Sequence, residues 1–122
     1  MALPELIVFS NRQKVVALAR DLLAERIGIV QCSRALAFLS HRVGAAQFDT
    51  DFLLFVGIDS ETDHLPIGEV RRHWAADALA TKDAELAEAE AFYRPQALEA
   101  CVRLIARFAD EQPPYDSYVP NT

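Results

Sequence analysis

Apolar side chains recur at three- and four-residue steps over most of this chain, which is the spacing of one buried face on a helix. The first such stretch runs from about Arg12 to Arg26, and the Ser-x-x-Gln sequence at 10–13 is typical of a capping box. Gly28 and Gly44 follow the first and the second stretch, and each is expected to end its helix in the left-handed conformation. The short link between these two helices predicts an antiparallel hairpin.

The two ends of the chain carry the least periodic sequence. Residues 1–10 are interpreted as an N-terminal arm, although the apolar run Leu6–Phe9 fits a backward extension of the first helix equally well. From Asp110 onward the sequence holds three prolines and few aliphatic residues. Residues 110–122 are therefore expected to form an extended, flexible tail.

The densest apolar run of the chain is Phe52–Ile58, and its length fits a buried strand or a short buried helix. The only other strand-like run that could pair with it is Leu6–Phe9. Because a strand without a partner cannot complete its hydrogen-bond ladder, we predict a helix. Asp49 or Thr50 would cap this helix, and Asp51 would lie at the positive end of its dipole.

The last long apolar stretch begins near Thr81 or Lys82 and runs to about Ala109. It keeps its helical phase across Pro95, so we predict one long C-terminal helix that is kinked at this proline. Acidic residues crowd the first half of this helix: Glu85, Glu88 and Glu90.

The composition favours one helical domain. The chain has 122 residues, of which 52% are hydrophobic and only four are glycine. We therefore predict an all-α fold, in which residues 1–122 form a single-domain bundle of about four to five helices. Cys32 and Cys101 lie in apolar helical contexts and are expected to fill the core. No apolar run approaches the about 20 residues that span a bilayer, and no signal peptide is evident, so we expect a cytoplasmic protein without membrane contact.

The charge balance limits the classes of partner. Eighteen acidic residues outnumber twelve basic ones, which gives a net charge of −6. The basic residues are scattered, and Arg71 and Arg72 are the only adjacent pair. This distribution argues against a nucleic-acid interface and suits a basic protein partner.

The candidate site lies where the apolar run turns abruptly polar, before a proline turn and the single tryptophan. Asp63 is expected to fold back across this turn onto Arg71 or Arg72, so that the block forms a buried polar hub; an exposed binding face is the alternative. No catalytic constellation is evident, and no catalytic residue is assigned. The predicted binding residues are Asp59, Ser60, Glu61, Asp63, His64, Arg71 and Trp74.

A metal site is the competing interpretation of the same region. Glu61-x-x-His64 has the spacing that di-metal sites use in helical bundles, but the second copy that such a site needs is absent. Glu69, His73 and Asp77 form another row at four-residue steps. Short coincidences of this kind are frequent in charged helical proteins, so we predict neither a metal nor another cofactor and keep these five residues as the alternative ligand set.

Residues 60–74 match the pattern S-E-T-D-x-L-P-x-G-x-x-R-x-x-W. This core resembles a family of small bacterial proteins that share a domain of unknown function, and the resemblance covers about the C-terminal two-thirds of the chain. It implies a bacterial origin and brings no catalytic residue with it.

Two classes of function remain open. The first is a non-enzymatic, acidic interaction protein, of the inhibitor or immunity type that masks a basic toxin or enzyme. The second is a metal- or small-molecule-binding helical domain, with or without hydrolytic activity. The small size and the acidic charge favour the first, and a homodimer is compatible with either.

Overall fold

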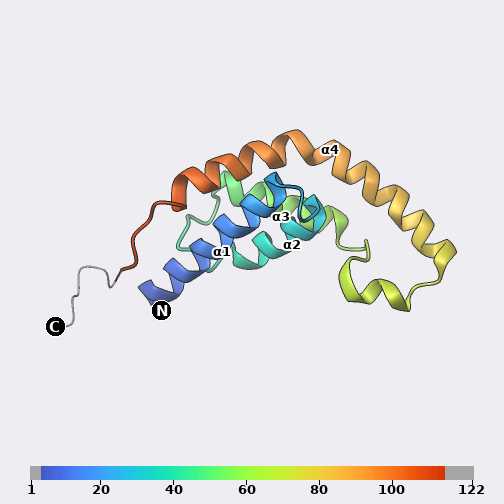
Figure 1. Cartoon of the computed structure of the whole chain (residues 1–122), viewed down its shortest axis with the longest axis horizontal. Helices are drawn as coiled ribbons and strands as arrows, with labels where there is room; N and C mark the ends of the chain where they lie inside the picture. Colours follow the sequence, from blue (N-terminus) through green and yellow to red (C-terminus); the bar gives the residue numbers. More distant parts are fainter. Residues whose placement is uncertain (1–3, 115–122) are drawn as a thin grey trace.

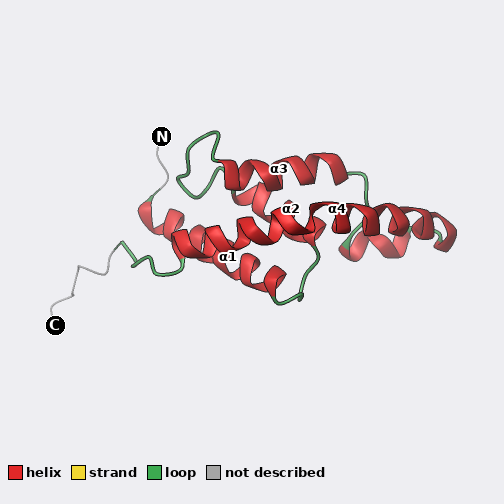
Figure 2. Cartoon of the chain, turned by 90° about the horizontal axis from the view of Figure 1, so that it is seen from above, coloured by secondary structure: helices red, strands yellow, loops and turns green. Residues whose placement is uncertain are grey.

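A computed structural model describes residues 4–114, and within them all regular secondary structure is helical (Figures 1 and 2). The prediction of an all-α bundle is therefore confirmed. The elements in chain order are α1 (Glu5–Leu23), α2 (Ile29–Leu39), α3 (Thr50–Thr62), the 3₁₀ helix η1 (Gly68–His73) and α4 (Ala76–Phe108).

The core lies where the three shorter helices meet the second half of α4. Figure 1 shows α4 arching over α1, α2 and α3. In this arrangement α1 packs mainly against α4, and α2 packs mainly against α3. Cys32 and Cys101 are both free and fully buried in this core, as expected. Contact with Cys101, together with burial, raises the pKa of the Cys32 thiol, so this thiol stays protonated.

Helix α3 contains the apolar run whose structure was ambiguous, and the prediction of a helix is confirmed. Its N-cap is Asp49, whose carboxylate accepts hydrogen bonds from the backbone N–H groups of Asp51 and Phe52 at 3.1 and 3.4 Å. The side chains of Phe52, Phe55 and Ile58 are buried in the core. Their three-residue spacing places them on one face of the helix, which is why the run is helical although nearly all of its residues are apolar.

Helix α4 is continuous through Pro95, as predicted, and Figure 1 shows that it bends along its length. It begins at Ala76, earlier than Thr81. Its fully buried residues all follow the proline: Ala97, Ala100, Cys101, Leu104 and Phe108. The first half therefore projects beyond the core and lies above η1 in Figure 1. Although α4 has 33 residues, no helix within residues 4–114 is long and apolar enough to cross a membrane.

Of the two interpretations of Leu6–Phe9, the backward extension of the first helix is confirmed and the separate arm was wrong. Helix α1 begins at Glu5, directly after Pro4, so residues 5–10 are helical and do not form a separate arm. Ser10 therefore lies inside the helix and cannot cap it. The physical reason is that Leu6–Phe9 continue the helix without a break, and the carbonyl of Pro4 already accepts the first backbone hydrogen bonds.

Only one of the two predicted glycine terminators has left-handed geometry. Glu25, with a φ of 59°, makes the turn after α1, whereas Gly28 has an extended backbone and precedes α2. Gly44 does have a positive φ of 69°, but α2 has already ended at Leu39.

Gly28 instead permits a long-range helix cap. The carboxylate of Glu90, on α4, accepts hydrogen bonds from the backbone N–H groups of Ile29 and Val30 at 2.8 and 2.9 Å. A Cβ atom at position 28 would lie 3.2 Å from a Glu90 oxygen. A side chain at Gly28 would therefore require the Glu90 carboxylate to shift by a few tenths of an ångström.

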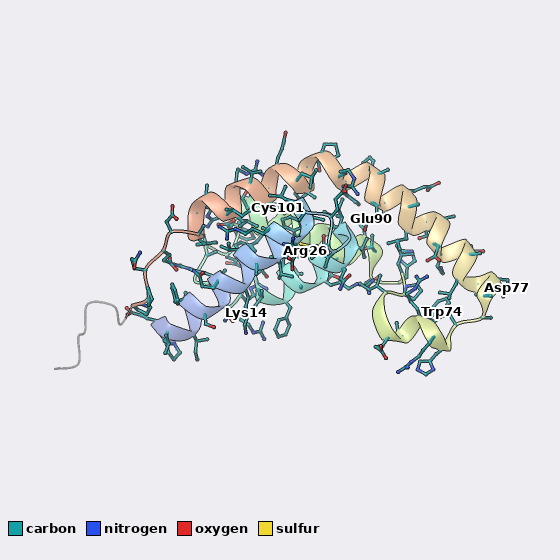
Figure 3. All side chains as sticks on the ribbon, viewed as in Figure 1. Lys14, Arg26, Trp74, Asp77, Glu90 and Cys101 are labelled. Carbon is teal, nitrogen blue, oxygen red and sulfur yellow. The ribbon has the colours of Figure 1, made fainter. Side chains whose placement is uncertain are left out.

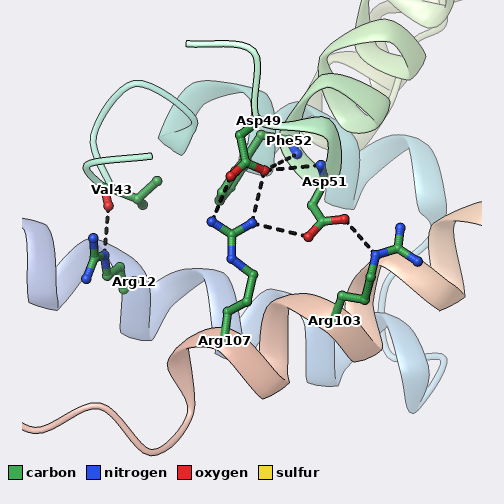
Figure 4. Close-up of polar contacts among 7 residues, drawn as sticks. All are labelled: Arg12, Val43, Asp49, Asp51, Phe52, Arg103 and Arg107. Carbon is green, nitrogen blue, oxygen red and sulfur yellow. Dashed lines mark hydrogen bonds and ion pairs between the residues drawn. The ribbon is translucent and has the colours of Figure 1, made fainter. Parts of the chain in front are cut away.

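A cluster of four charged side chains holds the start of α3 against the end of α4 (Figure 4). The guanidinium of Arg107 binds both oxygens of Asp49 at 3.0 and 2.7 Å and one oxygen of Asp51 at 3.2 Å. Arg103 binds the other oxygen of Asp51 at 2.7 Å. Asp51 is therefore paired and buried, in addition to lying in the first turn of the helix. The hydrogen bond from Arg107 holds the pKa of Asp49 below its ordinary value.

The predicted flexible tail, residues 110–122, lies mostly outside the described residues and can be followed only to Pro114. Within that range, Glu111 pairs with Arg12 of α1 at 2.5 Å. Arg12 also donates to the carbonyl of Val43 at 2.7 Å. The residues directly after α4 are thus tied to α1.

Candidate functional site

The predicted buried hub does not form. The side chain of Asp63 is 76% exposed, and its only ion-pair partner in the described part of the chain is His64, at 4.0 Å. Arg71 instead binds both oxygens of Asp83, on α4, at 2.7 and 2.9 Å. Arg72 pairs with a neighbour on η1. The expected pairing of Asp63 with an arginine was therefore wrong, because the first half of α4 brings a different carboxylate to η1.

Of the other predicted residues, Asp59 has a structural partner, and Trp74 lies in a different part of the molecule. Asp59 lies 3.5 Å from Arg34 of α2, and Arg34 donates to the carbonyls of Thr62 and Leu65 at 2.6 and 2.7 Å. This guanidinium therefore caps the C-terminal end of α3. Trp74 is half-buried at the junction of η1 and α4, beyond the main body of the molecule (Figure 3).

The alternative metal ligands do not come together. Glu69 and His73 lie on η1, whereas Asp77 lies in the first turn of α4, so a break in the helix separates them. Glu61 lies in the last turn of α3, and His64 lies in the loop beyond the helix. Within residues 4–114 no group of three or more His, Cys, Asp or Glu side chains is arranged to hold a metal ion. The row at four-residue steps was thus wrong, because it assumed one continuous helix.

His64 does have a partner that its neighbours in sequence did not indicate. Its Nε2 atom contacts a carboxylate oxygen of Glu85, on α4. The amine of Lys82 lies 3.9 Å from the other oxygen. Contact with His64 lowers the pKa of Glu85, so this carboxylate stays ionised at neutral pH.

A surface pocket of about 370 Å³ opens between the end of α3, the loop that follows it and the first half of α4. Glu61 and Ser60 are exposed at this end of α3, but only Glu61 lines the pocket. The residues that line it are Glu61, Thr62, Leu65, Glu85, Glu88, Ala89, Phe92 and Tyr93. Of the seven predicted binding residues, Glu61 therefore lines the pocket, and His64 contacts Glu85 of the pocket wall.

The pocket combines carboxylates with aromatic rings. Phe92 is 72% exposed, and its ring meets that of Tyr93 edge to face, with 4.9 Å between their centroids. Three glutamates line the same pocket, and no basic residue does. In the described part of the chain, Glu61 and Glu88 form no ion pair. Carboxylates beside an open ring face attract a cation.

The sequence contains one indication of this pocket that is separate from the pattern of apolar residues. Glu85, Glu88 and Phe92 recur at three- and four-residue steps, which places them on one face of α4. This face lies beside the apolar stripe and carries charge. The spacing of buried positions therefore does not identify it. That it meets the end of α3 could not be inferred from its spacing.

The fold and this pocket define a small all-α protein with an acidic, aromatic-walled pocket on its surface. Comparison of the chain with protein-family models, with curated proteins and with solved structures finds no significant match. The resemblance of residues 60–74 to a bacterial family therefore stays a prediction.

Asp63 is exposed and, within residues 4–114, forms no ion pair with a buried residue. The variant Asp63→Ala is therefore expected to change the free energy of unfolding by less than about 0.5 kcal/mol. Arg34→Ala is the positive control at the same end of α3, and it should cost about 1–2 kcal/mol because two carbonyls lose their donor. Urea denaturation monitored by circular dichroism measures both. A loss of about 3 kcal/mol or more in Asp63→Ala would reinstate the buried hub.

Proposed function

We propose that this protein is a non-enzymatic interaction protein whose acidic pocket binds an arginine or lysine side chain of a basic partner protein. One observation carries the proposal: Glu61, Glu85 and Glu88 line the same surface pocket as the exposed ring of Phe92. An inhibitor of the immunity type would use such a pocket to cover a basic side chain of the toxin or enzyme that it masks.

The chemistry of the wall supports a cationic group over a neutral one. An ammonium or guanidinium group can contact a ring face and a carboxylate at the same time, and each contact strengthens the preference for positive charge. The C-terminal end of α3 also lies at the pocket and adds partial negative charge, although Arg34 offsets part of it.

The distribution of charge supports a basic partner at longer range. The first half of α4, from Ala76 to Glu90, carries five acidic residues and one basic residue. The chain as a whole carries a net charge of −6. Such a field speeds the association of an oppositely charged protein, and this effect weakens as salt is added.

A pair of matched peptides tests the proposal. The probe is acetyl-Gly-Gly-Arg-Gly-Gly-amide, and the control peptide has citrulline in place of arginine, which keeps the shape and removes the charge. In a titration of the ¹⁵N-labelled protein, the arginine peptide is expected to shift the amide signals of residues 61–65 and 85–93. The citrulline peptide should leave them unchanged at the same concentration.

Two variants should weaken this binding by about fivefold each: Glu88→Gln, which removes a carboxylate, and Phe92→Ala, which removes the ring. Glu99→Gln is the matched control, because Glu99 is an exposed glutamate on α4 that does not line the pocket. Shifts that spread over the whole acidic surface, or that persist in both pocket variants, would contradict a specific site.

A further inference from the structure

A second hollow lies on the outer side of the α1–α2 hairpin and shares no residue with the acidic pocket. Its volume is about 470 Å³, and its floor is made mostly of small or aliphatic side chains, among them Ala17, Leu18 and Ala35. Lys14 and Asp21 line it as well. Figure 3 shows Lys14 on the side of α1 that is turned away from α4. No element within residues 4–114 covers this hollow.

Phe38 stands at the edge of the hollow with 63% of its surface exposed. It remains outside the core because α2 buries its opposite face, which carries Ile29 and Leu36. The guanidinium of Arg42 lies 4.0 Å from the centre of its ring and donates to its carbonyl, so the side of the ring that faces away from Arg42 remains free for contact. The surface thus presents a large apolar projection directly beside a hollow floored by alanines.

The register of the α1–α2 hairpin determines where Phe38 lies relative to the hollow. The amide of Asn11 donates to the carbonyl of Arg42 at 3.0 Å, and the thiol of Cys32 lies 3.8 Å from the carbonyl of Leu18. The later part of α2 therefore runs beside the earlier part of α1. Phe38 lies at the same end of the hollow as the lysine of α1, and the aspartate of α1 lies at the other end.

The charges on this face are complementary under a two-fold rotation. Lys14 and Asp21 are seven residues apart on α1, which corresponds to two helical turns or about 10 Å. When two copies of α1 cross in opposite directions, the lysine of each copy lies opposite the aspartate of the other. In the monomer Asp21 pairs with Arg26 at 2.8 Å, but this is an exposed pair that can be exchanged at little cost.

We propose that a second copy of this chain covers the hollow. In this isologous dimer, Phe38 of each copy enters the alanine-floored hollow of the other, and Lys14 of each copy pairs with the other copy's Asp21. A projection, a matching hollow and both members of an ion pair on one face are what a self-complementary interface requires. The two buried aromatic anchors would supply most of its binding energy.

Sedimentation equilibrium of the full chain tests the dimer. The wild type is expected to associate reversibly, and Phe38→Ala is expected to weaken the association about 30-fold. Phe48→Ala is the matched control, because Phe48 is an equally exposed phenylalanine that lies outside the hairpin. It should dissociate as the wild type does. Thermal melts of both variants verify that each is folded.

Charge reversal then tests the geometry. Lys14→Glu leaves two acids facing each other across the two-fold axis, and Asp21→Lys leaves two lysines, so each variant alone is expected to be monomeric. An equimolar mixture of the two should restore a heterodimer, because every charge then meets its opposite.

A wild type that remains monomeric up to about 1 mM would overturn the proposal. A dimer that Phe38→Ala leaves intact, or a mixture of the two charge variants that stays monomeric, would do the same. The arginine-peptide titration is independent of these results, because the hollow and the acidic pocket have no residue in common.

Discussion

The variant Phe55→Ala is expected to lower the free energy of unfolding by about 4 kcal/mol. Phe55 is the largest of the fully buried side chains and sits on α3 in the centre of the core. Removing the ring loses its transfer free energy and leaves a cavity that the neighbouring helices cannot fill. Since small domains are stable by only about 5–15 kcal/mol, a loss of this size should be evident in a urea denaturation curve.

Leu53→Ala is the matched control on the same helix. Leu53 is exposed, so its truncation creates no internal cavity. The expected loss in the free energy of unfolding is below about 1 kcal/mol. The contrast between the two variants tests the orientation of α3 as well as its helicity. Equal losses at both positions would mean that the apolar run is rotated about its axis relative to the core.

The second large effect is expected at Arg107. Its guanidinium pairs with Asp49 and Asp51, whose side chains are only 14% and 10% exposed. Arg107→Ala would leave these two carboxylates without their common partner, which we expect to cost about 3 kcal/mol. This is the lower end of the range for a buried pair, because the edge of the guanidinium reaches solvent. Arg103→Ala should cost about 1 kcal/mol, since Arg103 is more exposed and contacts one oxygen of Asp51 alone.

The dependence on pH identifies the source of this loss. The pKa of Asp49 is lowered from 3.8 by the hydrogen bond from Arg107. A carboxylate with a lowered folded-state pKa contributes stability above its unfolded pKa and loses that contribution as the pH falls through its folded pKa. Wild type and Arg107→Ala should therefore differ most near pH 7 and converge as the pH falls below the unfolded value of 3.8. A difference that stays constant across this range would assign the loss to packing of Arg107 on Phe108 instead of to charge.

Local sequence was sufficient for the regular structure. The stripes at three- and four-residue steps predicted the all-α fold and the single long helix through Pro95. The helical state of Phe52–Ile58 was predicted because a strand there would lack a pairing partner. Asp49 was one of two predicted caps of α3, and it is the cap in the structure. These features depend on residues within one or two turns of each other, where backbone geometry alone decides which side chains share a face.

Helix ends depended on more than local sequence. Gly28 was expected to end α1, but Glu25 makes that turn, and Gly28 stands where Glu90 of α4 caps the next helix. Glu90 is 61 positions from Ile29, from whose backbone N–H it accepts a hydrogen bond. No pattern around Gly28 indicates that a carboxylate approaches it, so the reason for the glycine became visible only in the folded chain.

The pairing of charges between different elements was decided by tertiary structure. Near Arg71 the sequence offered Asp63 as a partner, yet the structure pairs Arg71 with Asp83 and joins His64 to Glu85. Several acids lie within reach of each cation in the sequence, and their electrostatic energies differ little until the helices are docked. The docking of α4 beside the end of α3 selects among them. The same docking places Glu85, Glu88 and Phe92 of α4 opposite the end of α3, where they line the pocket.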